Sequence, residues 1–128
     1  MLRILILALL AVGCSSTSKP ATVALADVPA REAVTCSGDD CSLCWDRAQL
    51  WLVGHSKWKI QTATNAVIQT FSPAGSEPSY GFTVTKEPDG TGAHRIRLSM
   101  SCGNMLGCSP KPVDVARAFY HYVETGED

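Results

Sequence analysis

The sequence lacks an apolar run long enough to cross a bilayer. Its longest one, Ile4 to Val12, is far short of the roughly 20 residues that a spanning helix needs. It also lacks an excess of positive charge, because 11 Lys and Arg are balanced by 12 Asp and Glu, for a net charge of −1. Nucleic-acid-binding domains are usually strongly basic. These two absences argue against a membrane-spanning protein and a nucleic-acid-binding protein.

The signatures of common enzymes are missing as well. No serine lies in a G-x-S-x-G turn, and the acidic residues fall mainly in expected loops and in the tail, so the paired carboxylates of glycosidases are not indicated. The three histidines, His55, His94 and His121, are widely spaced. We therefore expect no enzyme, no cofactor, no metal and no small-molecule substrate.

The N-terminus has the pattern of an export signal, with Arg3 followed by the short apolar run. The next residues, Leu10 to Cys14, resemble the lipobox of bacterial lipoproteins. This resemblance implies cleavage after residue 13, acylation of Cys14, and sorting to the outer membrane because Ser15 follows. A secretory signal that leaves Cys14 as an ordinary thiol is the alternative.

Residues 14–33 are expected to form a lipidated N-terminus and a flexible tether, because residues 15–33 are rich in Ser, Thr, Ala and Pro. Such a tether would reach about 25 Å. The alternative is an edge strand from Val23 to Val28. Residues 34–128 are then the globular domain.

Within this domain, three- and four-residue spacing predicts a helix from Cys41 to His55, capped by Asp39 or Asp40. A second apolar stripe predicts a helix that begins at Pro112 and ends at Gly126. Alternation of apolar and polar residues predicts four strands between the helices, at about 58–64, 66–71, 80–85 and 94–102.

The predicted fold class is α+β, with a four-stranded antiparallel sheet and both helices packed on one face. In outline this order of elements resembles the helix-grip or TATA-binding-protein-like domains of some outer-membrane assembly lipoproteins. A likeness of fold does not by itself imply a function.

Export would place the cysteines in an oxidising compartment, where disulfides persist. We expect Cys102 to pair with Cys108 and Cys36 with Cys41, which leaves Cys44 as a buried free thiol. Pairing of Cys44 with Cys102 or Cys108 is an alternative.

Other chemistry for these cysteines is less favoured. Haem attachment requires C-x-x-C-H, but Trp45 follows Cys44. A thioredoxin-like motif needs a preceding strand in a parallel unit, which residues 37–40 do not supply. A zinc site would use Cys41, Cys44, Cys102 and Cys108, with a wider spacing in the second pair than is usual.

Three features could form a binding surface. Met105 and Leu106 are expected at the tip of the loop between Cys102 and Cys108. Trp45 lies off the main helical stripe and could anchor a partner, and packing in the core or partial cover by the tether is the alternative. A basic patch on the outer sheet face, which could meet an anionic partner, would consist of Lys57, Lys59, Arg95 and Arg97.

The resulting hypothesis is a small outer-membrane lipoprotein that faces the periplasm. It would be held in the lipid bilayer by acylated Cys14, and its domain would be a non-catalytic binding or accessory component with an envelope protein as partner. The alternatives are an exported inhibitor or exclusion factor against a foreign enzyme, phage or plasmid, and a small envelope hydrolase or redox protein.

Overall fold

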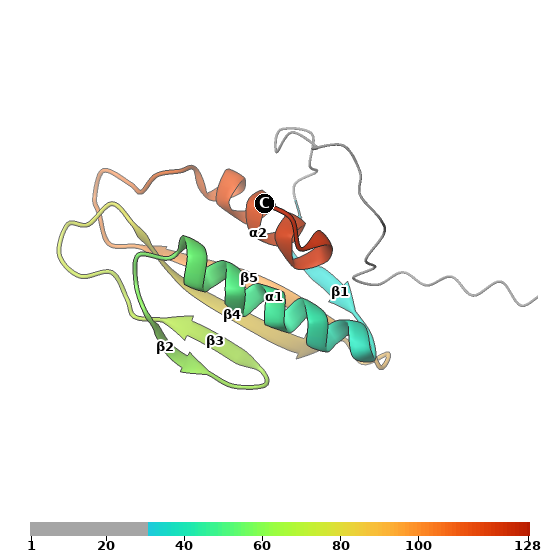
Figure 1. Cartoon of the computed structure of the whole chain (residues 1–128). Coiled ribbons are helices and arrows are strands. Elements are labelled where there is room, and N and C mark those ends of the chain that lie inside the picture. Colours follow the sequence, from blue (N-terminus) through green and yellow to red (C-terminus); the bar gives the residue numbers. More distant parts are fainter. Residues whose placement is uncertain (1–30) are drawn as a thin grey trace, which may run out of the picture.

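The computed structural model describes residues 31–128, so the expectations for the signal peptide, Cys14 and most of the tether lie outside the described residues. The described chain is an α+β domain with two helices, as predicted (Figure 1). Its elements in chain order are β1 (Val34–Cys36), α1 (Asp39–His55), β2 (Ile60–Ala63), β3 (Val67–Thr70), β4 (Tyr80–Pro88), β5 (His94–Cys102) and α2 (Pro112–Thr125).

The sheet has five strands in the order β1-β5-β4-β3-β2, and every neighbouring pair is antiparallel. The prediction of four strands is wrong because it missed β1. This strand has only three residues, too few to show an alternation, and it is defined by its pairing with β5, which sets Val34 opposite Ile96. Both of these side chains are buried.

The β4–β5 hairpin is the longest pairing in the sheet and supplies much of the core. On β4, Tyr80, Phe82 and Val84 are buried, and Val84 lies opposite Leu98 of β5. Successive strand residues point to opposite faces, so these side chains share one face. The predicted alternation in both strands is thus present.

Figure 1 shows α1 and α2 lying side by side over the sheet. Trp51 of α1 contacts both other layers. Its ring lies nearly perpendicular to the ring of Phe82 on β4, at a centroid distance of 5.7 Å, and to the ring of Phe119 on α2, at 5.3 Å. Perpendicular aromatic pairs add to the stabilisation that burial alone provides. Trp51 therefore occupies the junction of both helices and the sheet.

The start of α1 differs from the prediction. The helix begins at Asp39, its N-cap residue is Gly38, and no side chain caps it. Asp39 and Asp40 lie in the first turn instead, where their negative charge favours the positive end of the helix dipole. Gly38 takes a positive φ of 55°, a backbone conformation that glycine adopts without steric cost.

The end of α2 follows the prediction. Gly126 is in the left-handed conformation, and its N–H donates to the carbonyl of Tyr122 at 2.7 Å. Arg47 of α1 donates to the carbonyls of Val123 and Glu124 at 3.4 and 2.7 Å. These bonds satisfy carbonyls at the end of α2 and tie the two helices together.

Trp45 is buried, with 7 % of its surface exposed, so it packs in the core and does not form an exposed anchor. Its indole Nε1 donates to the carbonyl of Thr64 at 3.1 Å, and Lys86 Nζ lies 5.0 Å from the ring centroid. Trp45 was placed off the helical stripe, but the β2–β3 turn and β4 cover that side of α1. Trp58 is only half-buried.

Candidate functional site

Both predicted disulfides are present among residues 31–128. Cys36 bonds to Cys41 with a Cα–Cα distance of 4.9 Å, and Cys102 bonds to Cys108 with a Cα–Cα distance of 5.9 Å. The first bond joins β1 to the first turn of α1. The second closes the connection between β5 and α2, and we term residues 102–108 the disulfide loop.

Cys44 is completely buried, but the prediction of a free thiol is wrong, because no described cysteine is free. Cys44 is disulfide-bonded, although neither of the two pairs above contains it. Pairing with Cys102 or Cys108 is excluded because these two bond to each other. The prediction counted five cysteines because it set Cys14 aside as the lipid-bearing residue, and an odd number left one unpaired.

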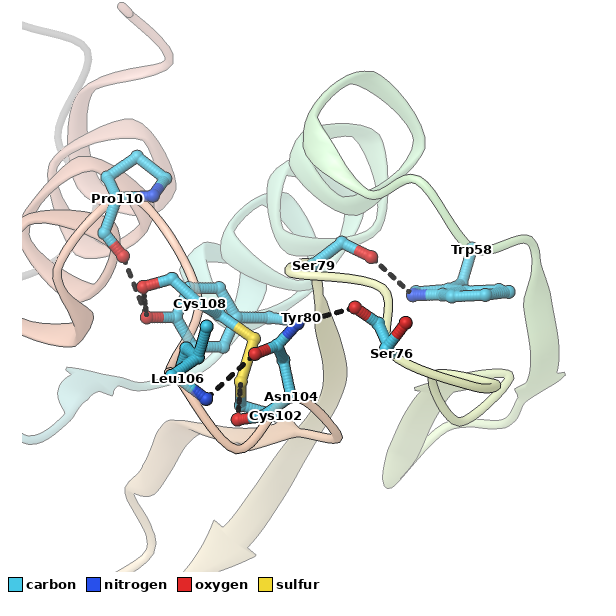
Figure 2. Close-up of a disulfide and its surroundings, with 9 residues drawn as sticks. All are labelled: Trp58, Ser76, Ser79, Tyr80, Cys102, Asn104, Leu106, Cys108 and Pro110. Carbon is cyan, nitrogen blue, oxygen red and sulfur yellow. Dashed lines mark hydrogen bonds between the residues drawn. A yellow bond between two sulfur atoms is a disulfide. The ribbon is translucent and has the colours of Figure 1, made fainter.

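The disulfide loop is organised from within by Asn104 (Figure 2). The side-chain carbonyl of Asn104 accepts from the backbone N–H of Leu106 at 2.8 Å, and its backbone carbonyl accepts from Gly107 at 3.0 Å. Its amide nitrogen donates to the carbonyl of Ser76 in the β3–β4 connection. An asparagine that bonds to the backbone two residues ahead is typical of a tight turn.

The tip of this loop is the most exposed apolar feature of the described chain. Met105 and Leu106 have relative exposures of 101 % and 98 %. Neither side chain therefore contributes to the core, although the disulfide and Asn104 hold the backbone beneath them. The predicted display of these two residues is thus present.

The base of the loop is fixed to the sheet by Tyr80. Its hydroxyl, at the start of β4, lies 2.7 Å from the carbonyl of Pro110 and 3.2 Å from that of Cys108, and donates toward both (Figure 2). The backbone N–H of Ser109 also donates to the carbonyl of Pro78 at 3.4 Å. The buried ring of Tyr80 thus connects the loop to the core.

An apolar cavity of about 270 Å³ lies directly beside this base, between the end of α1, the start of β4 and the start of α2. We term it the aromatic pocket. Its floor consists of the buried side chains of Trp51, Tyr80, Phe82 and Val115. More exposed side chains surround its opening, and they include His55, Lys57, Ser79 and Asp114. No sequence pattern pointed to this pocket, because its residues come from four separate segments.

The four predicted basic residues are exposed but do not form one patch. Lys57 and Lys59 lie just before edge strand β2, whereas Arg95 and Arg97 lie on β5, with β3 and β4 between them. Lys57 forms an ion pair with Glu77, and Arg97 Nε lies 3.8 Å from a carboxylate oxygen of Glu87. Partial neutralisation and separation weaken the case for an anionic partner on this face.

The residues that would hold a metal are engaged elsewhere. Cys41, Cys102 and Cys108 are in disulfides, so they cannot act as thiolate ligands, and this removes the zinc alternative. Within residues 31–128, no three His, Cys, Asp or Glu side chains gather into a group that could hold a metal ion. None of the helices in that part of the chain is long and apolar enough to span a membrane.

Among residues 31–128, one tyrosine and one aspartate have clearly shifted pKa values, and neither lies at the loop tip. Burial raises the pKa of Tyr120 above its usual 10.0, because the charged phenolate is poorly solvated there. Hydrogen bonds from the Thr91 side chain and backbone lower the pKa of Asp89, which lies on the exposed β4–β5 turn. Both shifts have structural causes.

In comparisons with known proteins, no family model, no curated protein and no solved structure matches this chain.

Proposed function

We propose that this chain is a lipid-anchored outer-membrane protein whose domain is a non-catalytic binding component of the cell envelope, and that the disulfide loop recognises its protein partner. The single observation that carries the proposal is the near-complete exposure of Met105 and Leu106 on a loop that a disulfide and Asn104 hold in one shape.

Two physical arguments support recognition by the loop. Apolar side chains gain free energy when a partner removes them from water, about 25 cal/mol for each Å² buried. A loop that is already ordered loses little conformational entropy on binding, so more of this gain is retained as affinity. Leu50 and Val53 of α1 are also exposed, at 60 % and 66 %, and they provide the control surface in the experiments below.

The proposed partner is a protein of the envelope, because export and a lipid on Cys14 would hold the domain close to the bilayer. A lipoprotein carries several acyl chains, and each buried methylene contributes about 0.8 kcal/mol to membrane binding. The proposed orientation is toward the periplasm. The tether would hold the domain about 25 Å from the membrane surface on average.

The binding role is tested by site-specific photo-crosslinking of the full-length protein in intact cells. A photoreactive residue at position 106 should crosslink an envelope protein, whereas the same residue at position 50, an exposed leucine on α1, should not. The crosslink should disappear in the Met105→Ser variant and in a Cys102→Ala/Cys108→Ala variant. Equal crosslinking from both positions would contradict recognition by the loop.

The anchor is tested separately by metabolic labelling with radioactive palmitate. The wild-type protein should carry the label and stay with the outer-membrane fraction, whereas Cys14→Ser should lose the label. Because one sulfur cannot hold both a lipid and a disulfide, a disulfide-linked peptide that joins Cys14 to Cys44 would overturn the anchor.

An inhibitor or exclusion factor is the second proposed function, and the shape of the loop favours it. A constrained loop with an apolar tip can insert into the active-site cleft of an enzyme with little loss of entropy. In that case deletion of the gene should reduce resistance to phage, conjugation or lysozyme. The Met105→Ser/Leu106→Ser variant should fail to restore resistance, whereas Leu50→Ser/Val53→Ser should restore it.

A further inference from the structure

The protein shields its two described disulfides from solvent to different degrees. Cys36 and Cys41 are buried in the core, whereas Cys102 is exposed and Cys108 is half-buried. A disulfide is reduced by exchange when a thiolate reaches one of its sulfur atoms, so the rate depends on access. A reductant can therefore reach the bond of the disulfide loop in the folded protein, whereas the other bond becomes accessible only when the core opens.

The fold keeps the two cysteines of the disulfide loop together without their bond. Cys102 is the last residue of β5 and pairs with Tyr80 of β4. The hydroxyl of the same tyrosine donates toward the carbonyl of Cys108, and its ring is buried (Figure 2). Tyr80 thus holds both cysteines, so their thiols stay close to each other after reduction and can bond again.

The order of the loop tip depends more strongly on the bond. Within the loop, Asn104 accepts from the N–H groups of Leu106 and Gly107. The amide nitrogen of Asn104 donates to the carbonyl of Ser76. Water competes for these exposed hydrogen bonds, so each contributes little, and the two exposed side chains at the tip add no packing. Opening of the disulfide therefore releases residues 103–107 while the rest of the domain stays folded.

We propose that the Cys102–Cys108 bond is a reversible redox switch, which a protein dithiol opens to end the ordered display of the loop tip. A thiolate of the dithiol attacks Cys102 Sγ and forms a mixed disulfide, and Cys108 leaves as a thiolate that takes a proton from water. The second thiolate of the reductant then attacks its neighbouring sulfur and releases Cys102, which is also protonated. The loop gains two electrons and two protons, and the dithiol becomes a disulfide.

The first measurement compares the reduction of the two bonds in the full chain at neutral pH. Dithiothreitol, a small dithiol, is added, and samples taken over time are blocked with iodoacetamide and digested with trypsin. The two bonds fall in separate peptides, 32–47 and 98–117, because cleavage follows Lys and Arg except before Pro. The cysteines of the disulfide loop should be alkylated at least about tenfold faster than Cys36 and Cys41.

Two further measurements test the release of the loop and its reversal. Hydrogen exchange at the amides of Leu106 and Gly107 should become at least about threefold faster after reduction, while exchange in α1 stays unchanged. Oxidised glutathione should then restore the bond. Tyr80→Phe should slow this step by up to about fivefold, because the hydroxyl no longer holds the second cysteine, whereas Tyr122→Phe on α2 should leave it unchanged.

Three results would overturn the switch. The first is equal alkylation of the two bonds, which would show that burial does not protect the core disulfide. The second is unchanged exchange at Leu106 and Gly107 after reduction, which would show that Asn104 alone orders the loop. The third is a bond that does not re-form, or that re-forms equally fast in Tyr80→Phe, because the fold would then not hold the thiols together.

This inference rests on the proposed function, since it supplies regulation of the same loop, but the measurements above need no partner. In isolated membranes, the crosslink from position 106 should be lost with dithiothreitol and should return on oxidation. A crosslink that persists in the reduced protein would overturn the switch. The absence of a crosslink in the oxidised protein would contradict only partner recognition, which keeps the two failures distinct.

Discussion

The two disulfides of the described chain close loops of nearly equal length in opposite surroundings. The bonded cysteines are five residues apart in Cys36–Cys41 and six residues apart in Cys102–Cys108. Cys36 pairs with His94 at the first residue of β5, whereas Cys102 is its last residue. The two bonds therefore lie at opposite ends of the same strand.

Their burial differs sharply. Cys36 and Cys41 are 1 % and 7 % exposed and belong to the core, whereas Cys102 is exposed and Cys108 only half-buried. The loss of chain entropy on closing each loop is almost the same, because it depends on loop length. The disulfide at the start of β5 thus stabilises the core. The disulfide at the end of β5 holds a loop whose apolar tip is exposed to water.

The largest expected effect is on the free energy of unfolding, which the removal of each disulfide should lower by a different amount. Each loop closure contributes about 2 kcal/mol by the entropic argument. Cys36→Ala/Cys41→Ala also leaves buried space, which raises its total cost to about 4 kcal/mol, whereas Cys102→Ala/Cys108→Ala should cost about 2 kcal/mol. Urea unfolding without reductant measures both values. Equal losses would contradict the contrast between a core disulfide and a display disulfide.

A second effect concerns Tyr120, which secures the chain just before β1. Its hydroxyl donates to the carbonyl of Glu32 at 2.7 Å and accepts from the N–H of Leu98 at 2.9 Å. Tyr120→Phe should lower the free energy of unfolding by about 2 kcal/mol, because two partners lose their bonds. Urea unfolding checks the value, and a loss below about 0.5 kcal/mol would contradict it.

The hydroxyl of Tyr80 has the corresponding role at the disulfide loop, and its removal should lower the free energy of unfolding by less. Its single proton is shared between the carbonyls of Cys108 and Pro110, so Tyr80→Phe should cost about 1 kcal/mol. Hydrogen exchange of the amides in residues 103–109 should become faster, while exchange in β1 stays unchanged. Faster exchange in both regions would show that the two ends are not independent.

Alkaline pH should lower the free energy of unfolding through Tyr120, whose hydroxyl binds the chain just before β1. The pKa of Tyr120 is raised by burial above the 10.0 of an unfolded tyrosine. Above pH 10 the unfolded chain has lost a proton that the folded chain still holds, so stability falls as pH rises from there toward the folded pKa. Unfolding midpoints at pH 9 to 11 should show a shallower decline in Tyr120→Phe than in the wild type.

The smallest expected effect on stability comes from the loop tip. Met105→Ser/Leu106→Ser removes two side chains that are fully exposed, so the free energy of unfolding should change by less than about 0.5 kcal/mol. A destabilisation above about 1 kcal/mol by urea unfolding would show that the tip contributes to the fold, which would contradict its role in display.

Much of the architecture was predictable because its signals are local. The alternation through Ile96 and Leu98 predicted β5, and the stripe through Phe119 and Val123 predicted α2. The pairing of Cys102 with Cys108 followed from their closeness in sequence. Each of these predictions depended on residues within a few positions of one another.

The errors came from features set by distant segments. β1 exists because β5 offers it an edge, and Trp45 is buried because Thr64 and Lys86 lie over it. None of these contacts leaves a periodic pattern in the sequence.

By itself, the sequence determined both helices, four of the five strands and the cysteines that close the two short loops, because local spacing governs these features. Only the tertiary structure decided that the base of the disulfide loop, at Ser109 and Pro110, adjoins an aromatic pocket, because that pocket forms where α1, β4 and α2 converge. Packing of segments that are remote in the chain, and not propensity within any one of them, created this pocket.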